Sequence, residues 1–298
     1  MSESLPSLKN ADLFGKRVLV RGDFDVDDGN NPRADSIRSV VTFLKEKGAA
    51  KVRVIGHTET KYDLASQLRT EFVDVEFDSE VRNNPGEKEN SEEYATELAG
   101  DFEVYVNEAF ATSHRKHASI VGVPKVIRQR GGQVVVGQRF EKELEMLSTV
   151  WNHAGKRILV IGGVKIDDKQ KFAEDMQDKF TAILKGGLLP GVKLREDGLD
   201  ISDEAIEEYV KEIQTAEVIL AAGVMGKYED TNCSKGTETI LRAITDNLGA
   251  YKVAGGGDIE MAISTFGLTE KFNWISVGGG AMLVYLSTGT LPGLLAVC

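Results

Sequence analysis

Residues 157–169, RILVIGGVKIDDK, predict a buried strand that ends in a glycine turn. The apolar run Ile158–Ile161 is typical of a strand covered on both faces of a parallel sheet. Gly162 and Gly163 follow it, and two glycines at this position let the backbone approach a ligand without a Cβ in between. The stretch therefore predicts a strand, a tight turn and a helix start in direct succession.

The residues after this turn suit a phosphate group. We expect a helix over 168–179, whose first turn offers free N–H groups and the positive end of a dipole. Lys165 and Lys169 add full positive charges at the same place. Two interpretations stay open from these residues alone, namely a polyphosphate site and a plain strand-to-helix turn with solvated lysines.

Length and charge limit the classes of protein that this chain can belong to. Its 298 residues exceed one typical domain, so we expect two domains of about 150 residues each. The net charge of −11 and a pI near 5.0 argue against a general nucleic-acid binder and against a binder of anionic membranes. Any site for an anion must therefore be a local cluster of positive groups.

Targeting and cysteine signals are weak. The first residues, MSESLPSLKNADLF, lack the basic and apolar regions of a signal peptide, and no apolar run approaches the length of a membrane span. We expect a cytoplasmic protein. Cys233 and Cys298 form neither a disulfide framework nor a metal quartet.

Predicted strands and helices alternate along almost the whole chain. The expected strands are 17–24, 51–57, 73–77, 102–110, 133–137, 157–163, 181–187, 217–223, 251–257 and 274–280. The expected helices between them include 36–47, 91–98, 140–150, 168–179, 202–213 and 235–247. This alternation predicts an α/β protein with parallel sheets covered by helices on both faces, in which ligands bind beyond the carboxyl ends of the strands.

Different residue types gather at the strand ends of the two halves. In the first half these positions carry charged side chains, which are Arg21, Asp23, Asp25, Arg33, His57, Arg82, His114, Arg115 and His117. In the second half they carry glycines together with Lys165, Lys169 and Asp258. The first half resembles a charged site for a small anion, whereas the second resembles a backbone cradle for phosphates.

Two glycine runs near the end of the chain, AGGGDIE (254–260) and VGGGAM (277–282), each close a strand and open a helix. Such turns bind anions through backbone N–H groups. Neither run has the Gly-x-Gly-x-x-Gly spacing with a later acidic residue, so a dinucleotide fingerprint is not supported. Asp258 follows the first run, where it could cap the helix or hold Mg²⁺ beside phosphates.

The segment His114–His117, HRKH, places two imidazoles and two cations in four residues. A metal site is not favoured, because no third ligand lies nearby in the sequence. Arg115 can bind carboxylate or phosphate oxygens bidentately, whereas Arg33 and Arg82, each taken alone, are better explained as surface arginines. No Ser-His-Asp arrangement or nucleophile elbow indicates a covalent mechanism.

Taken together, these residues resemble the phosphoglycerate kinase family along most of the chain and in the family's order. The matching stretches are KRVLVRGDFDV, KVRVIGH, EVRNNPGEKENSEEYA, VYVNEAFATSHRKHASIVGVPK, EKELEML, ILVIGGVKIDDK, VMGKYE, SKGT, VAGGGDIE, ISVGGGA and LPG. The resemblance implies two doubly wound parallel-sheet (Rossmann-like) domains. It also implies reversible transfer of the acyl phosphate of 1,3-bisphosphoglycerate to ADP, a step of glycolysis.

The resemblance implies a role for each site residue. The residues expected to bind 3-phosphoglycerate are Asp23, Asp25, Arg33, His57, Arg82 and Arg115. Those expected at the nucleotide are Gly162, Gly163, Lys165, Lys169, Gly186, Gly187, Leu199 (adenine), Gly223, Glu229 (ribose), Gly255, Gly256, Gly257, Gly278, Gly279 and Gly280. Asp258 is expected to hold Mg²⁺ with ATP or ADP, and Arg33, Lys165, Gly257 and Gly280 to act on the transferring phosphoryl group.

The resemblance also implies how the chain is divided. We expect an acceptor domain over 1–140, a hinge helix and joint over 141–156, and a nucleotide domain over 157–298 whose C-terminal tail could return to the first domain. Within the hinge region, FEKELEMLSTV (140–150) has apolar residues at helical spacing, and 151–156 is expected to be a flexible joint. Hinge closure would exclude water from the reaction. The expected partners are small molecules, with no nucleic acid or membrane, and the expected state is a monomer.

The chain departs from the family in length. Only 25 positions separate His57 from Arg82, which indicates that a helix and a strand usual in the first domain are missing. A larger piece of the nucleotide domain is missing between Leu188 and Leu199.

Four functional positions also differ from the family. Thr60, followed by Lys61, stands for an arginine, Asp25 and Ala222 each stand for an asparagine, and Ile259 stands for a threonine. Losing one phosphate-facing donor typically costs about 10²–10³ in rate. A catalytically weak or inactive nucleotide-binding relative is therefore the alternative.

Overall fold

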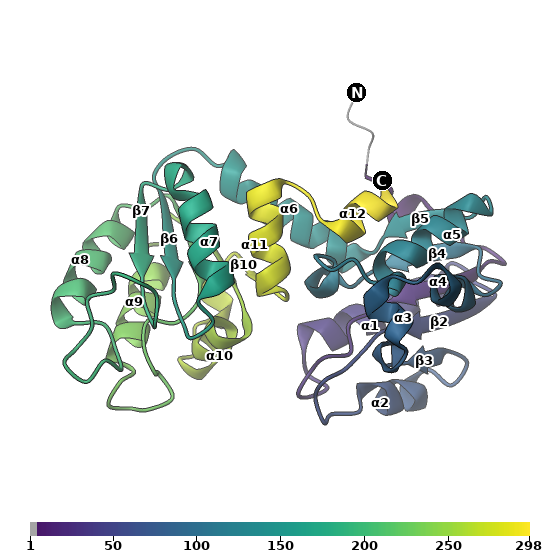
Figure 1. The fold of residues 1–298 in the computed structure, drawn as a ribbon, viewed down its shortest axis with the longest axis horizontal. Coiled ribbons are helices and arrows are strands. Elements are labelled where there is room, and N and C mark those ends of the chain that lie inside the picture. Colours follow the sequence, from purple (N-terminus) through teal and green to yellow (C-terminus); the bar gives the residue numbers. More distant parts are fainter. Residues whose placement is uncertain (1–4) are drawn as a thin grey trace. The chain divides into compact units, whose positions relative to one another are not determined.

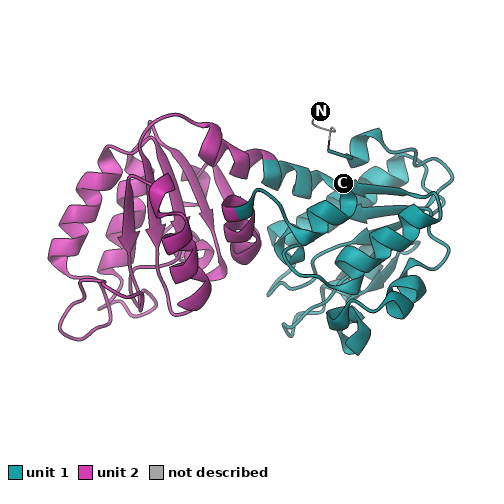
Figure 2. Ribbon diagram, turned by 45° about the horizontal axis from the view of Figure 1, so that its top comes forward, with its two compact units in different colours: residues 1–144, 288–298 teal, residues 145–287 magenta. Residues whose placement is uncertain are grey.

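The computed structural model describes residues 5–298, which form two compact units (Figures 1 and 2). Unit 1 contains the chain up to Leu144 together with Thr288–Cys298, and unit 2 contains Glu145–Ser287. Each unit is built around one five-stranded parallel sheet. No helix in the described part of the chain is long and apolar enough to cross a membrane.

The sheet of unit 1 has the strand order β3-β2-β1-β4-β5. Its strands are β1 (Arg17–Arg21), β2 (Lys51–Ile55), β3 (Glu76–Asp78), β4 (Val104–Asn107) and β5 (Gln133–Val136). The central strand β1 pairs with β2 on one side and with β4 on the other. The strand order reverses between β1 and β4, so the carboxyl ends of these two strands mark the crevice where such sheets bind ligands.

Helices cover both faces of this sheet. They are α1 (Pro32–Glu46), α2 (Leu64–Glu71), α3 (Pro85–Glu89), α4 (Glu92–Ala99), α5 (Val123–Gln129), the first part of α6 (Gln138–Asn152) and α12 (Pro292–Val297). α1 starts where Asn31 accepts a hydrogen bond from the N–H of Arg33 and Pro32 occupies the first turn. Its apolar face and that of α2 join one cluster with β1, β2 and β4.

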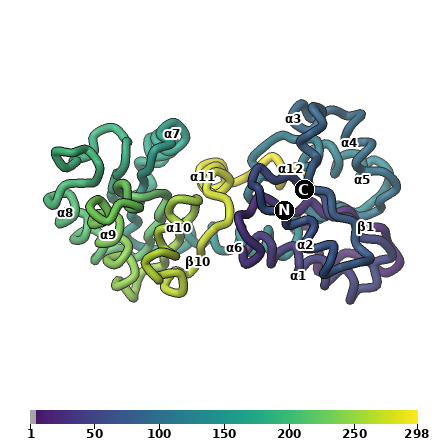
Figure 3. Tube along the Cα trace, turned by 90° about the horizontal axis from the view of Figure 1, so that it is seen from below, coloured from purple at the N-terminus to yellow at the C-terminus, as the bar shows by residue number. Residues whose placement is uncertain are grey.

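The C-terminal segment belongs to unit 1. Arg128 Nη2 donates a hydrogen bond of 2.6 Å to the carbonyl of Val297, and the N–H of Gly293 donates one of 2.9 Å to the carbonyl of Ser113. Figures 2 and 3 show the C-terminus with the elements of this unit. These contacts attach α12 to α5 and to the loop that follows β4.

The sheet of unit 2 has the strand order β10-β9-β8-β6-β7. Its strands are β6 (Arg157–Ile161), β7 (Ala182–Lys185), β8 (Val218–Ala222), β9 (Tyr251–Gly255) and β10 (Trp274–Ser276). β6 pairs with both β7 and β8, and the order reverses between β6 and β8. The crevice of this sheet is therefore at the carboxyl end of β6, where Gly162 and Gly163 lie.

The helices of unit 2 are α7 (Asp167–Asp175), α8 (Asp203–Gln214), α9 (Lys235–Asp246), α10 (Gly257–Thr265) and α11 (Gly279–Thr288), and α6 enters it with its second part. Apolar residues of α8, α9 and α10 share one core cluster with β6, β8 and β9. α7 and α11 lie over the opposite face (Figure 1). Both sheets are thus covered on two sides, which confirms the predicted fold class.

All ten predicted strands are present, but most are shorter than predicted. β6 ends at Ile161, because Gly162 and Gly163 already belong to the turn, and the strand expected over 73–77 lies at Glu76–Asp78. The helix expected over 168–179 ends as α7 at Asp175 and is followed by a 3₁₀ turn, Gln177–Lys179. The interval between His57 and Arg82 holds one helix, α2, and one strand, β3.

The expected start of the flexible joint is wrong by two residues, since Trp151 and Asn152 continue α6. Trp151 is held by a 3.1 Å hydrogen bond from its indole N–H to the carbonyl of Leu286. Its ring also lies 5.4 Å from that of Phe180. This half-buried aromatic side chain holds the last turn of α6, which ends at Asn152.

Candidate functional site

Arg21 ends β1 inside the carboxyl edge of the first sheet. Its side chain is fully buried, and Nε donates a hydrogen bond of 2.9 Å to Ser119 Oγ. Nη1 donates to the carbonyl of Gly22, and Nη2 lies 3.0 Å from Nδ1 of His57. A guanidinium carries only donors, so each of these partners must act as an acceptor.

His57 follows β2 and is 2 % exposed. Burial, together with the neighbouring charges of Arg21 and Arg115, lowers its pKa to about 3. His57 is therefore neutral at physiological pH. It can meet a ligand as a hydrogen-bond donor but not as a charge.

Arg33 comes from the first turn of α1 and lies over the loop after β1. Its Nη1 donates a hydrogen bond of 2.8 Å to the carbonyl of Asp25 and lies 3.5 Å from Oδ2 of Asp23. The carboxylate of Asp25 accepts a 2.9 Å hydrogen bond from the N–H of Glu59. This loop therefore brings Asp23, Asp25 and Arg33 together.

Arg82 lies in the 3₁₀ turn after β3, and its Nη1 pairs with the carboxylate of Glu59. A cavity of about 470 Å³ has Arg82, His57, Thr60 and Lys61 in its wall. Arg82 and Asp25 are thus linked through the same residue, Glu59.

The HRKH segment follows the 3₁₀ turn after β4. Burial and the charges of Arg115 and Arg21 lower the pKa of His117 to about 4. Nδ1 of His117 lies 3.6 Å from the fully buried carboxylate of Glu87. Arg115 is half-buried, and its charge contributes to the lowered pKa of both His57 and His117. It therefore belongs to the same group of side chains.

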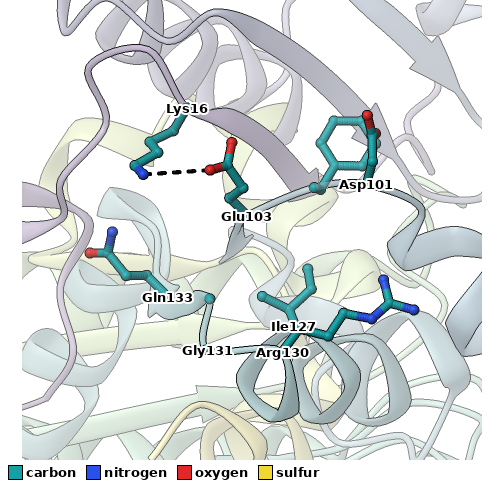
Figure 4. Close-up of a pocket in the computed structure, with 9 residues that line it drawn as sticks. Lys16, Asp101, Glu103, Ile127, Arg130, Gly131 and Gln133 are labelled. Atoms are coloured by element: carbon teal, nitrogen blue, oxygen red, sulfur yellow. Dashed lines mark hydrogen bonds and ion pairs between the residues drawn. The ribbon is translucent and has the colours of Figure 1, made fainter.

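A separate cavity of about 290 Å³ lies at the amino ends of β1, β4 and β5 (Figure 4). Two charged residues in its wall form an ion pair, with 3.4 Å between Lys16 Nζ and Glu103 Oε1. Parallel sheets bind their ligands at the opposite edge, so this cavity is not assigned to the site.

In unit 2, Gly162 and Gly163 lie between the turns that follow β7 and β8. The N–H of Leu188 donates a 3.0 Å hydrogen bond to the carbonyl of Gly163, and the N–H of Gly187 donates one of 2.7 Å to the carbonyl of Met225. A Cβ on Gly162 would lie 2.9 Å from the carbonyl carbon of Gly186. The three turns can approach this closely only because glycines, which have no side chain, occupy the positions of contact.

Lys169 projects from the first turns of α7 back to this glycine cluster, where Nζ donates a hydrogen bond to the carbonyl of Gly162. Burial is the main cause that lowers the pKa of Lys169; Asp258 opposes the shift and Lys165 adds to it. A Cβ on Gly163 would lie 2.9 Å from Nζ of Lys169 and 3.5 Å from Oδ2 of Asp258. Lys165 is exposed and makes no hydrogen bond or ion pair with any residue between 5 and 298.

The two triple-glycine turns lie against each other. α10 begins at Gly257 and α11 at Gly279, so both helices direct their first N–H groups to the carboxyl edge of the sheet. A Cβ on Gly279 would lie 2.6 Å from Cα of Gly256. Around Gly257 a Cβ would find open space.

Leu199, expected at the adenine, is 43 % exposed, and its carbonyl accepts a 2.8 Å hydrogen bond from the N–H of Lys227. The neighbouring Asp200 is buried and accepts a 2.7 Å hydrogen bond from the N–H of Gly236. Glu229 is exposed. Burial raises the pKa of the Tyr228 phenol, and the charges of Glu229 and Asp258 add to this shift. Leu199 and Glu229 thus lie near the start of α9.

The sequence profile of the family described as "Phosphoglycerate kinase" matches residues 27–192 and 189–289. The chain belongs to the phosphoglycerate kinase family. The resemblance found in the sequence is thereby confirmed.

Curated relatives in this family are similar over nearly the whole chain. The phosphoglycerate kinase of Chlorobaculum tepidum is 29% identical over 360 positions, covering 99% of this chain and 90% of the relative. That of Acidobacterium capsulatum is 28% identical over 366 positions, covering 99% and 89%.

Solved structures support the fold. The phosphoglycerate kinase structure from Coxiella burnetii has a TM-score of 0.80 at 24% identity and covers 99% of both chains. The structure from Pyrococcus horikoshii has a TM-score of 0.81 at 22% identity and covers 98% of both chains.

The shortening relative to the family maps to a defined place. The two profile matches meet at residues 189–192, which lie within the predicted gap between Leu188 and Leu199. In the structure this interval is a connection from β7 to α8, closed by a bridge between Leu194 and Ile201. The alignments with relatives run over more positions than the 298 residues of this chain, as missing segments require.

The family departures have local structural roles. Thr60 donates a 2.6 Å hydrogen bond to the carbonyl of Val26, while Ala222 and Ile259 are buried in the core of unit 2. Lys61, next to Thr60, is exposed at the wall of the cavity that also holds His57 and Arg82.

Two buried residues that connect to the first site were not predicted to belong to it. They are Glu87 and Ser119. The sequence does not single out Glu87, because the adjacent Lys88 and Glu89 are charged as well but exposed.

Proposed function

We propose that this chain catalyses reversible phosphoryl transfer between 1,3-bisphosphoglycerate and ADP, giving 3-phosphoglycerate and ATP. The observation that carries the proposal is the close packing of Lys169, Asp258 and the glycine turns at the carboxyl edge of the second sheet. Membership of the phosphoglycerate kinase family supports the same reaction. We further propose unit 1 as the acceptor domain and unit 2 as the nucleotide domain.

In this proposal unit 1 binds the acceptor through the side chains at its carboxyl edge. Arg33 and Arg115 supply positive charge, and His57 supplies a neutral donor. The carboxylate of Asp25 accepts the N–H of Glu59, which ties it to the backbone of a neighbouring loop. Lys61 stands beside this cavity, where it offers a cation in place of the family's arginine.

Unit 2 binds the nucleotide phosphates with backbone N–H groups. The first turns of α10 and α11 provide them at Gly257 and Gly280, and Lys165 adds an exposed positive charge. A single exposed carboxylate, Asp258, fits Mg²⁺, which usually takes one or two carboxylates and completes its shell with phosphate oxygens and water. The bound metal would supply positive charge beside the transferring group.

The chemistry needs no nucleophile from the protein. A β-phosphate oxygen of ADP attacks the phosphorus of the acyl phosphate, and the bond from phosphorus to the carboxyl oxygen breaks, leaving 3-phosphoglycerate as a carboxylate. The residues of the chain position both substrates and stabilise the charge on the three equatorial oxygens. α6, which contributes residues to both units, connects the two binding surfaces.

A coupled assay of ATP formation from 1,3-bisphosphoglycerate and ADP, with calorimetric titration of ADP and of 3-phosphoglycerate, tests the proposal. We expect both ligands to bind and turnover to depend on Mg²⁺. Binding of nucleotide without turnover would instead favour a binding protein that retains the fold. Turnover with another carboxylate acceptor only, in a substrate panel, would change the proposed substrate.

A further inference from the structure

Behind the acceptor site lies a continuous row of buried polar groups. The carboxylate of Glu87 accepts hydrogen bonds of 2.6 Å from Ser119 Oγ and 2.8 Å from Ser119 N. Ser119 Oγ in turn accepts the 2.9 Å bond from Nε of Arg21. Glu87, Ser119 and Arg21 are all fully buried, so the serine couples a buried negative charge to a buried positive charge.

The row ends at His57. Nη2 of Arg21 lies 3.0 Å from Nδ1 of His57, and a guanidinium can only donate. Nδ1 must therefore be an unprotonated acceptor, which leaves the proton of the neutral ring on Nε2. Among the described residues no partner is hydrogen-bonded to Nε2, and His57 forms part of the wall of the 470 Å³ cavity.

We propose that Glu87, Ser119 and Arg21 form a positioning row that fixes His57 as the neutral Nε2–H tautomer, so that it presents one hydrogen-bond donor to an anionic ligand. The ligand part of this inference rests on the proposed function, whereas the tautomer part does not. Arg21 is a positioning residue here, because it acts through His57.

The surroundings of His57 agree with this arrangement. The groups that face it electrostatically are Arg21, Arg115, His117 and Arg33, all from other elements, and the backbone of Glu80 bridges to its own. Each of these side-chain charges is positive or potentially positive, so protonation of His57 would add a cation to a cationic cluster. The row holds the ring, while burial and the cationic cluster together keep it neutral.

The test uses long-range ¹H–¹⁵N correlation spectra of the imidazole rings in the full-length protein without ligand. The chain has four histidines, and a His57→Gln variant assigns the resonances of His57. From about pH 8 to about pH 5 we expect a neutral His57 with the proton on Nε2 throughout. A ring protonated on Nδ1, or one that titrates with a midpoint near its ordinary value, would overturn the proposal.

The row itself is tested by Ser119→Ala, which removes the hydroxyl between Arg21 and Glu87. We expect His57 to show either a mixture of tautomers or titration within the same pH range. Ser113→Ala is the matched control, since Ser113 is also fully buried but hydrogen-bonds to Asn107 and Ala109 rather than to Arg21. Spectra of Ser119→Ala that match those of the wild type would exclude the row as the cause.

The ligand-facing part is tested by adding 3-phosphoglycerate. We expect the Nε2–H resonance of His57 to shift while Nδ1 keeps its acceptor signal. If calorimetry detects binding but Nε2–H does not shift, the inference fails at this step. If 3-phosphoglycerate does not bind at all, the proposed function fails, and the spectra of the free protein still decide the tautomer.

Discussion

The backbone of Gly279, at the start of α11, packs directly on that of Gly256, at the start of α10. A Cβ added to Gly279 would lie 2.6 Å from Cα of Gly256, a distance that real Cβ contacts do not show. The glycines of these two runs are therefore required for packing as well as for access to a ligand. This distinction between packing glycines and open glycines leads to two predictions.

Gly279→Ala should destabilise unit 2 by about 1–3 kcal/mol, because the added methyl group forces the two turns apart. Denaturant unfolding measures the change. Gly249→Ala is the control, since its Cβ would meet only Asn247 Oδ1 at 3.9 Å. Equal stability of the two variants would mean that the turns are not in contact.

Gly257→Ala should leave stability unchanged and weaken nucleotide binding. A Cβ at this first residue of α10 meets nothing within 4 Å, so it would stand in the space where we expect phosphate oxygens. The measurements are the unfolding free energy and the KM for ATP. An unchanged KM and kcat would remove Gly257 from the site.

Lys165→Ala should reduce kcat by about 10²–10³ with no change in Tm, since the side chain is exposed and forms no hydrogen bond or ion pair within residues 5–298. Lys179→Ala, another exposed lysine of unit 2, is the control and should retain wild-type kinetics. Wild-type turnover in Lys165→Ala would exclude this residue from the mechanism.

Arg115→Ala should raise the KM for 3-phosphoglycerate more than that for ATP. The reason is that the charge of Arg115 lies close enough to His57 and His117, both in unit 1, to lower their pKa values. The adjacent Lys116 is exposed, and Lys116→Ala should change neither value by as much. Steady-state kinetics with each substrate varied in turn provide the measurement. A larger effect on ATP would contradict the assignment of the acceptor site to unit 1.

Buried titratable groups in unit 1 predict how stability depends on pH. The folded pKa values of His57 and His117, about 3 and about 4, lie below the ordinary value of about 6.5, so the unfolded chain binds more protons in between. The contribution of the two histidines to the unfolding free energy is complete above about pH 6.5. It is lost as the pH falls towards the pKa values that they have in the folded protein. Burial raises the pKa of Glu108 to about 7, which has the opposite effect between its ordinary value of 4.5 and about 7.

Glu108→Gln separates these opposing effects. The amide resembles the protonated carboxyl, whose Oε1 accepts hydrogen bonds from Ser36 and from the N–H of Arg139. Between about pH 5 and about pH 7 we expect the unfolding free energy of the variant to rise more steeply with pH than that of the wild type. The difference in slope corresponds to about one bound proton. Parallel curves for the two proteins would show that Glu108 is already ionised in the folded state.

Much of the fold followed from local patterns. Apolar runs followed by glycines, such as Ile158–Ile161, predicted several of the strands, because a strand buried on both faces is apolar throughout. The alternation with helical segments predicted the others. Their ends were less accurate, since a glycine that continues an apolar run can equally begin the turn. The joint after α6 was placed two residues early because the contact of Trp151 with Phe180 is distant in sequence.

The residue types of both candidate sites were also available from the sequence, as glycines with Lys165, Lys169 and Asp258 in one half and charged side chains in the other. Which of these side chains contact one another was decided only by the tertiary structure. Strand order brings Arg21, His57 and Ser119 together from three separate segments, and it buries Glu87 behind them. Composition and spacing determine which groups a chain carries to a sheet edge, but burial and long-range hydrogen bonds decide which of them are charged, which are neutral and which only hold others in place.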